Sequence, residues 1–576
     1  MRRSTRTSVL SRGYVSEVGD PAREGEAPAE PESWPGYVRL GRSLALPQCT
    51  DCLKGLSTSA LLLIALMAVA FGVYAAEERD REKETLANHS VRVRLTAKQS
   101  ELTFRASEAV TVSSEEGEHT LPAAIYSVRA SDVAPAKQRF HLFIKTFRPS
   151  EANEARQYLA HWKQQGYEPE LITFGKQLQT ESGKVIDGRG LWVSVARLNS
   201  MEKATSLKAK LDRHEVFGWI VPETTQQGKG LLTIKEVPGK KSLNVRLPAR
   251  LRCKRPIEIR NIDFGFWQPQ RANRSYSGAL EIAIGPDGLL EVYETLPIED
   301  YLAGVLPAEM PAEWPVEALK AQAVSARSEV ISSLAGKHML EGFDFCGTQH
   351  CRAYLGAGGR EKTTDRAVAD TAGVVLAAEG RVLPAVFSAN CGGWTEDNEC
   401  VWSAPPNPAL RGVPDFPSGK NGPSESGIAK WLKSPPPAYC SANSDNFRWV
   451  RKFTARELRD VVNKRYPVGD VRNIELGERG ASGRLKWVKI VGSKGTQVVR
   501  KELNIRLAFG GLKSAMFMVD IEGSKGAPAS FTFIGGGRGH GVGLCQDGAR
   551  ARALAGANYT QILGHYFSRS DVVRVR

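Results

Sequence analysis

Residues 301–327 read YLAGVLPAEMPAEWPVEALKAQAVSAR, a proline-bounded loop followed by a helix-forming stretch. Pro315 suits the first turn of a helix, which is predicted to run to about Leu334, before Gly336. Glu309 lies in the loop just before this helix, where a helix N-terminus would favour its charged form and burial would raise its pKa. Taken alone, this glutamate is best explained as a surface or capping carboxylate. The predicted apolar face consists of Val316, Leu319, Ala323, Val330 and Leu334, and the polar residues off that face are Lys320, Gln322 and Arg327.

A glycine-rich segment near the C-terminus is the second informative stretch. Residues 531–567 include six glycines between Gly535 and Gly543. Because glycine lacks a Cβ, such a loop lets the backbone approach a ligand closely. His540 lies within the loop, and a helix is predicted to begin near Gln546. A tight structural turn with a packed histidine would explain the same pattern, so this segment alone does not define a site.

Residues 139–224 contain two similar halves, each with a strand, a helix and a second strand. Pro149-Ser150 marks the start of the first helix, and Asn199-Ser200 caps the second. The stripes predicted for the two helices are Ala152, Ala155, Leu159 and Trp162, and then Met201, Ala204, Leu207 and Leu211. Strand-like alternation precedes and follows this unit, in residues 91–112 and 230–296. We therefore expect the flanking strands to form one domain with the βαβ–βαβ unit inserted.

Composition narrows the class of partner. The chain has 576 residues, of which 41% are hydrophobic and 24% charged, as in globular proteins. Its net charge of +15 suits an acidic partner such as nucleic acid, anionic lipid or an anionic polymer. The sequence contains no zinc-finger spacing, recognition-helix motif or RNA-binding signature, so nucleic acid is not an expected partner. An anionic cell wall would need the same basic surplus.

An apolar segment near the N-terminus predicts membrane attachment. Residues 57–76 read STSALLLIALMAVAFGVYAA, long enough as a helix to cover most of a bilayer core of ~30 Å. Eight Lys and Arg residues lie in the 1–54 tail, which suits the cytoplasmic side. A cleaved signal peptide with its site at residues 73–75 is the alternative. The length of the run favours a signal anchor, and both versions place the residues after 77 outside the cytoplasm.

Six segments occur together in the order and spacing of one protein family. They are SYSGALEI (275–282), YLAGVLPAEMPAEWPVEALKAQAVSAR (301–327), CGTQHCRAYLG (346–356), FSANCGGWTEDNE (387–399), LNIRLAFGGLKSAMF (503–517) and GRGHGVGLCQDGARARALAG (537–556). Residues 91–125 and 230–576 therefore resemble the stage II sporulation protein D (SpoIID) family. The inserted unit is similar to SPOR domains, small α+β modules that bind peptide-stripped glycan strands. The resemblance rests on FHLFIKTFRPSEANEA and LWVSVARLNSMEKA, each with a strand, a turn and Glu-x-Ala.

The SpoIID resemblance implies a lytic transglycosylase. Such enzymes cleave the β-1,4 bond between N-acetylmuramic acid and N-acetylglucosamine without water and leave a 1,6-anhydro end. One carboxyl group acts first as the acid and then as the base, whereas hydrolases normally need two. The family's catalytic glutamate maps to Glu309 in the AEM motif. The residues implied to line the glycan cleft are Gln322, Arg327, Ser388, His540 and Gln546. Because the family includes amidase enhancers, a non-catalytic peptidoglycan-binding enhancer is the alternative function.

The cysteines suggest a metal site. Cys346, His350 and Cys351, with His338 upstream, offer the N and S ligands that zinc prefers, and some family members bind zinc in this segment. A Cys346–Cys351 disulfide is the alternative in an oxidising compartment. Arg352 stands where the family usually has Gln, and Asp547 replaces a usual aromatic residue; both changes put substrate contacts in doubt. Cys391, Cys400 and Cys440 form a further group in which one pair could be bridged, and spacing cannot choose the partners.

These observations predict an α+β protein with a mixed, β-rich SpoIID-type domain, an inserted βαββαβ SPOR-like domain and one N-terminal transmembrane helix. The chemistry requires no cofactor, and any zinc would be structural. The expected partners are peptidoglycan strands, the membrane and a cell-wall amidase, with the main domains on the outer side of the cytoplasmic membrane. The predicted domains are a disordered cytoplasmic tail (1–54), a transmembrane anchor (55–76), a linker (77–90), the first part of the SpoIID-like domain (91–136), the SPOR-like domain (137–225) and the SpoIID-like catalytic domain (226–576).

Overall fold

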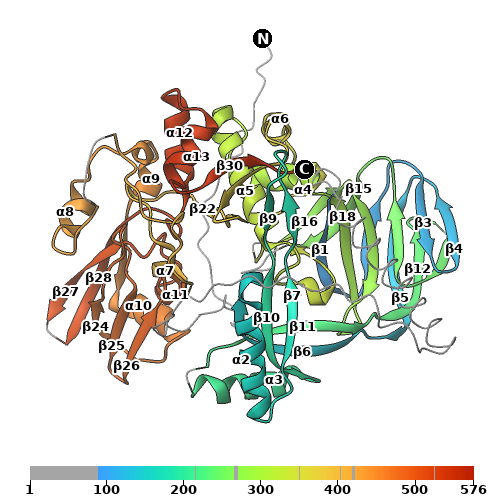
Figure 1. Cartoon of the computed structure of the whole chain (residues 1–576), viewed down its shortest axis with the longest axis horizontal. Coiled ribbons are helices and arrows are strands. Elements are labelled where there is room, and N and C mark those ends of the chain that lie inside the picture. Colours follow the sequence, from blue (N-terminus) through green and yellow to red (C-terminus); the bar gives the residue numbers. More distant parts are fainter. Residues whose placement is uncertain are drawn as a thin grey trace, which may run out of the picture.

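The computed structural model describes residues 89–576 apart from positions 215, 240, 265–269, 349, 403, 418–421 and 525. Over these residues the fold is mixed α+β and rich in strands (Figure 1), which confirms the predicted class. The tail and transmembrane helix predicted in residues 1–76, and most of the predicted linker, lie outside the described residues. Among the described helices, none is both long and apolar enough to cross a membrane.

Two sheets form the β-rich part of the main domain. The first has seven strands in the order β19-β1-β18-β17-β14-β3-β4, and the second has six in the order β13-β12-β5-β2-β15-β16. Gly285–Gly288 makes the tight turn between β17 and β18, with Gly288 at φ +78°, a conformation that favours glycine. The strands are β1 (Ser90–Gln99), β2 (Leu102–Arg105), β3 (Val110–Ser114), β4 (Gly117–Leu121), β5 (Ile125–Ala134), β12 (Lys229–Glu236), β13 (Ser242–Arg246), β14 (Ala249–Arg252), β15 (Ile257–Asp263), β16 (Arg271–Tyr276), β17 (Ala279–Ile284), β18 (Leu290–Pro297) and β19 (Phe345–Cys346).

A separate βαββαβ unit lies between β5 and β12. These two strands are antiparallel neighbours, with Val128 opposite Ile234, so the chain leaves the six-stranded sheet after β5 and returns beside it. The inserted sheet has the order β11-β6-β10-β7. Its elements are β6 (Lys137–Phe147), α2 (Ala152–Gln164), β7 (Glu170–Phe174), β10 (Gly190–Leu198), α3 (Met201–Asp212) and β11 (Trp219–Gln226), with a small hairpin of β8 (Gln177–Gln179) and β9 (Val185–Asp187).

Both faces of the inserted sheet are covered. Helices α2 and α3 pack on one face through residues that include Ala155, Trp162 and Leu211, and the Ser200 side chain caps α3 as predicted. Alternation along β6 sends Phe143 to the opposite face, where it meets three further rings and Leu340 of the main domain. The other rings of this aromatic cluster are Phe174, Trp192 and Trp219. The cluster therefore joins the insertion to the main domain.

A helical layer continues the main domain after β18. Helix α5 is buried almost all round, including the polar residues Gln322 and Arg327. The predicted single apolar stripe on α5 is wrong at one position, because Val316 is 43% exposed. Helix α5 spans Val316–Ser333. The other elements of this layer are α4 (Ile298–Glu309), α6 (Lys362–Asp370), β20 (Val374–Ala378), β21 (Arg381–Val382), β22 (Phe387–Ser388), β29 (Leu544–Cys545), α12 (Gln546–Leu554), α13 (Tyr559–Tyr566) and β30 (Asp571–Arg574).

The remaining C-terminal residues form a lobe with its own hydrophobic core, coloured orange in Figure 1. Two three-stranded sheets, β23-β28-β27 and β24-β25-β26, build this lobe. Strand β28 leads directly into the glycine-rich loop, which returns the chain to the main domain at β29. The elements of the lobe are β23 (Arg448–Thr454), α10 (Ala455–Asn463), β24 (Val471–Leu476), β25 (Trp487–Gly492), β26 (Thr496–Arg500), α11 (Glu502–Ala508), β27 (Phe517–Ser524) and β28 (Ala527–Gly536). Helices α7 (Asn398–Val401), α8 (Ile428–Lys433) and α9 (Ser444–Phe447) precede it, and their buried apolar residues belong to the core of the main domain.

Candidate functional site

Glu309 is the last residue of helix α4, not part of a loop before α5 as predicted. The helix ends there because Met310 precedes Pro311 and is extended, the conformation that a following proline favours. The carboxyl group is largely surrounded by protein, and this burial raises the pKa of Glu309 to about 7. The charge of Glu329 raises the pKa further, and that of Arg352 lowers it. Burial thus outweighs any helix-terminus effect and leaves a carboxyl group that can both give and accept a proton near neutral pH.

Two of the residues implied by the resemblance lie at Glu309. Gln546 is the first residue of α12, and its Nε2 donates to the backbone carbonyl of Glu309 at 3.1 Å. The same Nε2 lies 3.4 Å from Oε1 of Gln322 on α5. Segments about 240 residues apart in the sequence, α4 and α12, therefore meet around the candidate acid.

Several buried polar atoms in this region have no hydrogen-bond partner in the described part of the chain. They include Nε2 of Gln322, Oγ of Ser388, and Nε and Nη1 of Arg352. Ser388 is placed beside Gln546 because β22 pairs in parallel with β29, aligning Ser388 with Cys545. Buried polar groups are normally paired, so unpaired ones that gather in one region indicate a place where a polar ligand binds.

Arg352 and Glu329 also belong to this site. Nη2 of Arg352 lies 3.4 Å from Glu329 and 3.2 Å from Oγ of Ser333, and its guanidinium stacks on the Phe345 ring. The sequence pointed to Arg352 only as a departure from the family pattern, and Glu329 was missed. A signal for Glu329 was present, because it lies seven residues after Gln322 and thus on the same face of α5.

Arg327 does not line a cleft, so this part of the prediction is wrong. The residue is fully buried, and Nη2 forms an ion pair of 2.6 Å with Glu299. Its remaining donors reach the Thr371 hydroxyl and the carbonyls of Val368 and Val374. All of these partners belong to the protein, so Arg327 ties α4, α5 and α6 together.

His540 and the glycine-rich loop mainly serve the fold. Nδ1 of His540 accepts the backbone N–H of Val542 at 3.1 Å, and the ring packs on Trp402. Burial, and then the charge of Arg484, lower the pKa of His540 to about 3, so the ring is neutral. The glycines allow a close approach to Arg484 rather than to a ligand: a Cβ on Gly541 would lie 2.4 Å from its guanidinium carbon. The predicted contact of His540 with the glycan stays a prediction.

The four predicted zinc ligands do come together. The Cys346 and Cys351 sulfurs are 3.3 Å apart, Cys346 Sγ lies 3.3 Å from Nδ1 of His350, and Cys351 Sγ lies 3.4 Å from Nε2 of His338. A disulfide requires about 2.05 Å, so the two thiols are not bridged. The ligand atoms all lie within 4.8 Å of one another, and two thiolates with two imidazoles match the preference of zinc. Nδ1 of His338 is held by Glu341 at 2.6 Å, a contact typical of metal-bound histidines.

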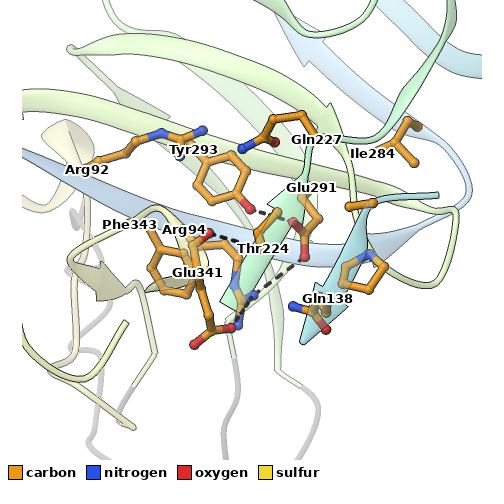
Figure 2. A pocket seen from close by; sticks show the side chains of 12 residues that line it. Arg92, Arg94, Gln138, Thr224, Gln227, Ile284, Glu291, Tyr293, Glu341 and Phe343 are labelled. Carbon is orange, nitrogen blue, oxygen red and sulfur yellow. Dashed lines mark hydrogen bonds and ion pairs between the residues drawn. The ribbon is translucent and has the colours of Figure 1, made fainter. Parts of the chain in front are cut away.

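A small cavity lies beside this cysteine–histidine cluster, where the insertion meets the main domain (Figure 2). Arg94 lies 3.5 Å from Glu291 and 3.7 Å from Glu341, and the Tyr293 hydroxyl donates to Glu291. The cavity measures about 20 Å³, room for about one water molecule and too little for a sugar. It is therefore part of the junction between the two units and not the substrate site.

Comparison with known proteins gives a family match for the segment that carries Glu309, Gln322 and Arg352. Residues 287–377, which include Glu309, Gln322 and the cysteine–histidine cluster, match the family model described as Stage II sporulation protein. Residues 396–543 match a domain of unknown function (DUF8618).

Three relatives are similar to about half of the chain. An uncharacterized protein of Brachyspira hyodysenteriae is 29% identical over 299 residues, which cover 52% of this chain and 72% of that protein. The stage II sporulation protein D of Bacillus amyloliquefaciens is 27% identical over 48% of this chain and 75% of its own length. The amidase enhancer of Bacillus subtilis is 28% identical over 46% of this chain, but only 39% of that protein is covered.

Proposed function

We propose that the chain is a peptidoglycan lytic transglycosylase that uses Glu309 as its single acid and base. The observation that carries this proposal is the half-buried carboxyl of Glu309, with a pKa raised to about 7, in a region of unpaired polar groups. The substrate is the β-1,4 bond between N-acetylmuramic acid and N-acetylglucosamine in peptide-stripped glycan strands. The biological setting is cell-wall remodelling or sporulation.

The reaction proceeds in two proton transfers that both involve the carboxyl group of Glu309. Protonated Glu309 gives its proton to the glycosidic oxygen as the bond to C1 of the muramic residue breaks. The resulting carboxylate then accepts the proton of the muramic 6-hydroxyl as that oxygen attacks C1, which restores the acid. Amide and guanidinium groups of Gln322 and Arg352 suit sugar hydroxyls and acetamido carbonyls. Because Glu329 is already paired with Arg352, it is a poor second carboxylate for activating water.

The test is product analysis with the full-length chain. Amidase-treated sacculi, whose glycan strands lack peptides, should release soluble sugars with 1,6-anhydro ends. Sacculi that stay insoluble at any enzyme concentration would refute the proposal.

The pH dependence follows from the raised pKa of Glu309. The first step needs the protonated acid, and a group with a pKa of about 7 loses it as pH rises through 7. We expect release to fall roughly tenfold between pH 6 and pH 8. Initial rates of anhydro-sugar formation measure this profile, and a midpoint at the ordinary glutamate pKa of 4.5 would show that the acid is not buried as described.

Replacing Gln546 with alanine should slow the reaction without unfolding the protein. The change removes the donor to the Glu309 carbonyl and leaves that partly buried oxygen without this hydrogen bond. Such a loss costs about 1–3 kcal/mol, so we expect release to drop roughly tenfold or more. The control is Gln497→Ala, a partly exposed glutamine of β26 whose amide donates to the carbonyl of the neighbouring Val498, and this variant should match the wild type. Equal rates for the two variants would remove Gln546 from the site.

The insertion and the N-terminus complete the proposal. The insertion acts as a SPOR-like module that recruits the chain to peptide-stripped glycan, and the βαββαβ order supports this role. Because both faces of its sheet are covered, glycan would have to bind at its edges, loops or helices. Residues 55–76 anchor the chain in the cytoplasmic membrane, with the main domains outside. The supporting feature is their apolar sequence.

A non-catalytic amidase enhancer is the second candidate function, favoured by the name of the Bacillus subtilis relative. An enhancer would raise the activity of a cell-wall amidase by binding, without needing a proton donor. Glu309→Gln would then leave amidase stimulation intact. Neither the wild-type chain nor the variant would form anhydro-sugars.

A further inference from the structure

A second group of cysteines lies deep in the protein, separate from the first cluster. Cys391 follows β22, Cys440 lies in a short helical turn (Tyr439–Ala442), and Cys545 ends β29. Asp415, from the loop between α7 and α8, completes the group. All four side chains are buried without measurable exposure, and their ligand atoms lie within 4.8 Å of one another. The group of Cys391, Cys400 and Cys440 expected from sequence is wrong in one member, because Cys400 lies with Glu396 and Asp397 instead.

The spacing of the ligand atoms suits a metal and not a disulfide. The Cys391 and Cys440 sulfurs are 3.6 Å apart, and Cys391 Sγ lies 3.6 Å from Oδ2 of Asp415. Two sulfurs bound tetrahedrally to zinc at about 2.3 Å are about 3.8 Å apart. A disulfide would need about 2.05 Å. Three sulfurs also exceed what one disulfide can use, and would leave a third buried thiol beside a buried carboxylate.

The surroundings orient the ligand atoms. The other carboxylate oxygen, Oδ1 of Asp415, accepts hydrogen bonds from the Tyr566 hydroxyl at 2.7 Å and from Arg552 at 3.2 Å. Oδ2 is thereby left facing the sulfurs. The backbone N–H of Cys391 donates to Sγ of Cys545 at 3.2 Å. Hydrogen bonds of this kind to ligand carboxylates and thiolates are the usual outer contacts of metal sites.

Positive charge lies next to the group, as a divalent ion with four anionic ligands requires. Three thiolates, one carboxylate and Zn²⁺ sum to −2, and two guanidinium groups lie next to them. Arg552 contacts Asp415 directly, and Arg448 donates to the carbonyl of Gly392, beside Cys391. His565, which contacts Arg552, has a pKa lowered to about 4 by burial and by that arginine, and adds no charge.

We propose that Cys391, Cys440, Cys545 and Asp415 form a second, fully buried zinc site with three sulfur ligands and one oxygen ligand. Loading releases three thiol protons as Zn²⁺ binds, with no change of oxidation state. The choice of zinc rests on the thiolate-rich, tetrahedral ligand set.

The position of this site gives it a structural role. Cys545 directly precedes Gln546, the residue that contacts the Glu309 carbonyl. A metal bound here joins the segments around residues 391, 415 and 440 to the first turn of α12. That turn is already packed tightly, since a Cβ on Gly548 would lie 2.4 Å from Oδ2 of Asp415. The ion therefore holds the beginning of α12, and with it Gln546, behind the candidate acid.

Metal analysis of the full-length chain tests the site. Elemental analysis of protein purified without chelator should find two zinc ions per chain. The double variant Cys346→Ser/Cys351→Ser removes the first cluster and should retain one ion. Cys391→Ser/Cys440→Ser should also retain one, because it removes only the second cluster. Cys253→Ser is the matched control and should keep both ions, since this thiol belongs to no ligand cluster in the described residues.

The result from Cys346→Ser/Cys351→Ser does not depend on whether the buried second cluster tolerates mutation. If the Cys346→Ser/Cys351→Ser variant folds but contains no zinc, the second site is overturned. So would a wild-type chain in which peptide mapping finds Cys391 disulfide-bonded to Cys440 or Cys545. Retention of the full wild-type metal content by Cys391→Ser/Cys440→Ser would overturn it as well.

Discussion

Replacing Glu309 with glutamine should lower the release of anhydro-sugars by about 10²–10⁴-fold, the usual contribution of a general acid or base. Glutamine keeps the shape and the hydrogen-bonding capacity of the side chain but cannot donate a proton to the glycosidic oxygen. The backbone contact between Glu309 and Gln546 does not involve the altered group, so it should persist. Initial rates on amidase-treated sacculi measure the loss.

Two controls separate chemistry from folding. Glu313→Gln changes an exposed carboxylate four residues further along and should leave the rate unchanged. The Glu309→Gln protein should melt no lower than the wild type at pH 8. This follows because the folded-state pKa is raised to about 7, so the charged carboxylate destabilises the fold increasingly as pH rises from 4.5 through 7. Full activity of the Glu309→Gln variant would show that another group acts as the acid.

The second large effect is expected at the cysteine–histidine cluster. Cys351→Ser removes a ligand from the proposed zinc site formed with His338, Cys346 and His350. Structural zinc sites contribute several kcal/mol or more to folding. We therefore expect the melting temperature to fall by roughly 10 °C or more, with loss of one zinc ion. Activity should fall too, because the next residue, Arg352, is paired with Glu329 near the candidate acid.

Chelation provides an independent test of the same claim. A strong chelator should lower the melting temperature of the wild type towards that of Cys351→Ser. Cys253→Ser is the control, because this half-buried thiol is not part of a ligand cluster in the described residues. If Cys351→Ser melts and retains zinc like the wild type, the cluster is not a metal site.

Local sequence signals were enough to predict the inserted unit. Proline at the start of one helix, Ser200 at the start of the other and alternating apolar residues in the strands all act within a few residues. The same holds for the turn between β17 and β18, where Gly288 adopts positive φ. Elements whose local preferences agree with the fold are the ones that can be read without knowing tertiary contacts.

Helix α4 was missed because its sequence contradicts its conformation locally. It contains Gly304 and Pro307, both unfavourable inside a helix. The glycine is required by packing, since a Cβ there would lie 2.4 Å from the Tyr354 ring. Glu309 was therefore predicted in a loop although it ends a helix.

Apart from the family resemblance, site residues were predictable only where their partners were local. Arg327 is polar and lies near Gln322 in the sequence, which suggested a place in the cleft. Its hydrogen-bond donors are instead used by Glu299 and by carbonyls far away in the sequence, and no local pattern reveals those partners. Cys545 lies 154 residues after Cys391, and their proximity follows only from the pairing of β22 with β29. The Cys346–Cys351 segment, in contrast, is compact enough for spacing alone to suggest a ligand set.

Digestion of amidase-treated sacculi in oxygen-18-labelled water tests the single-carboxylate mechanism most directly. Mass spectrometry of the soluble sugars should find 1,6-anhydro ends without the label from the wild-type chain, and no such ends from Glu309→Gln. Reducing ends that carry oxygen-18 would show that water attacks the sugar and would contradict the mechanism.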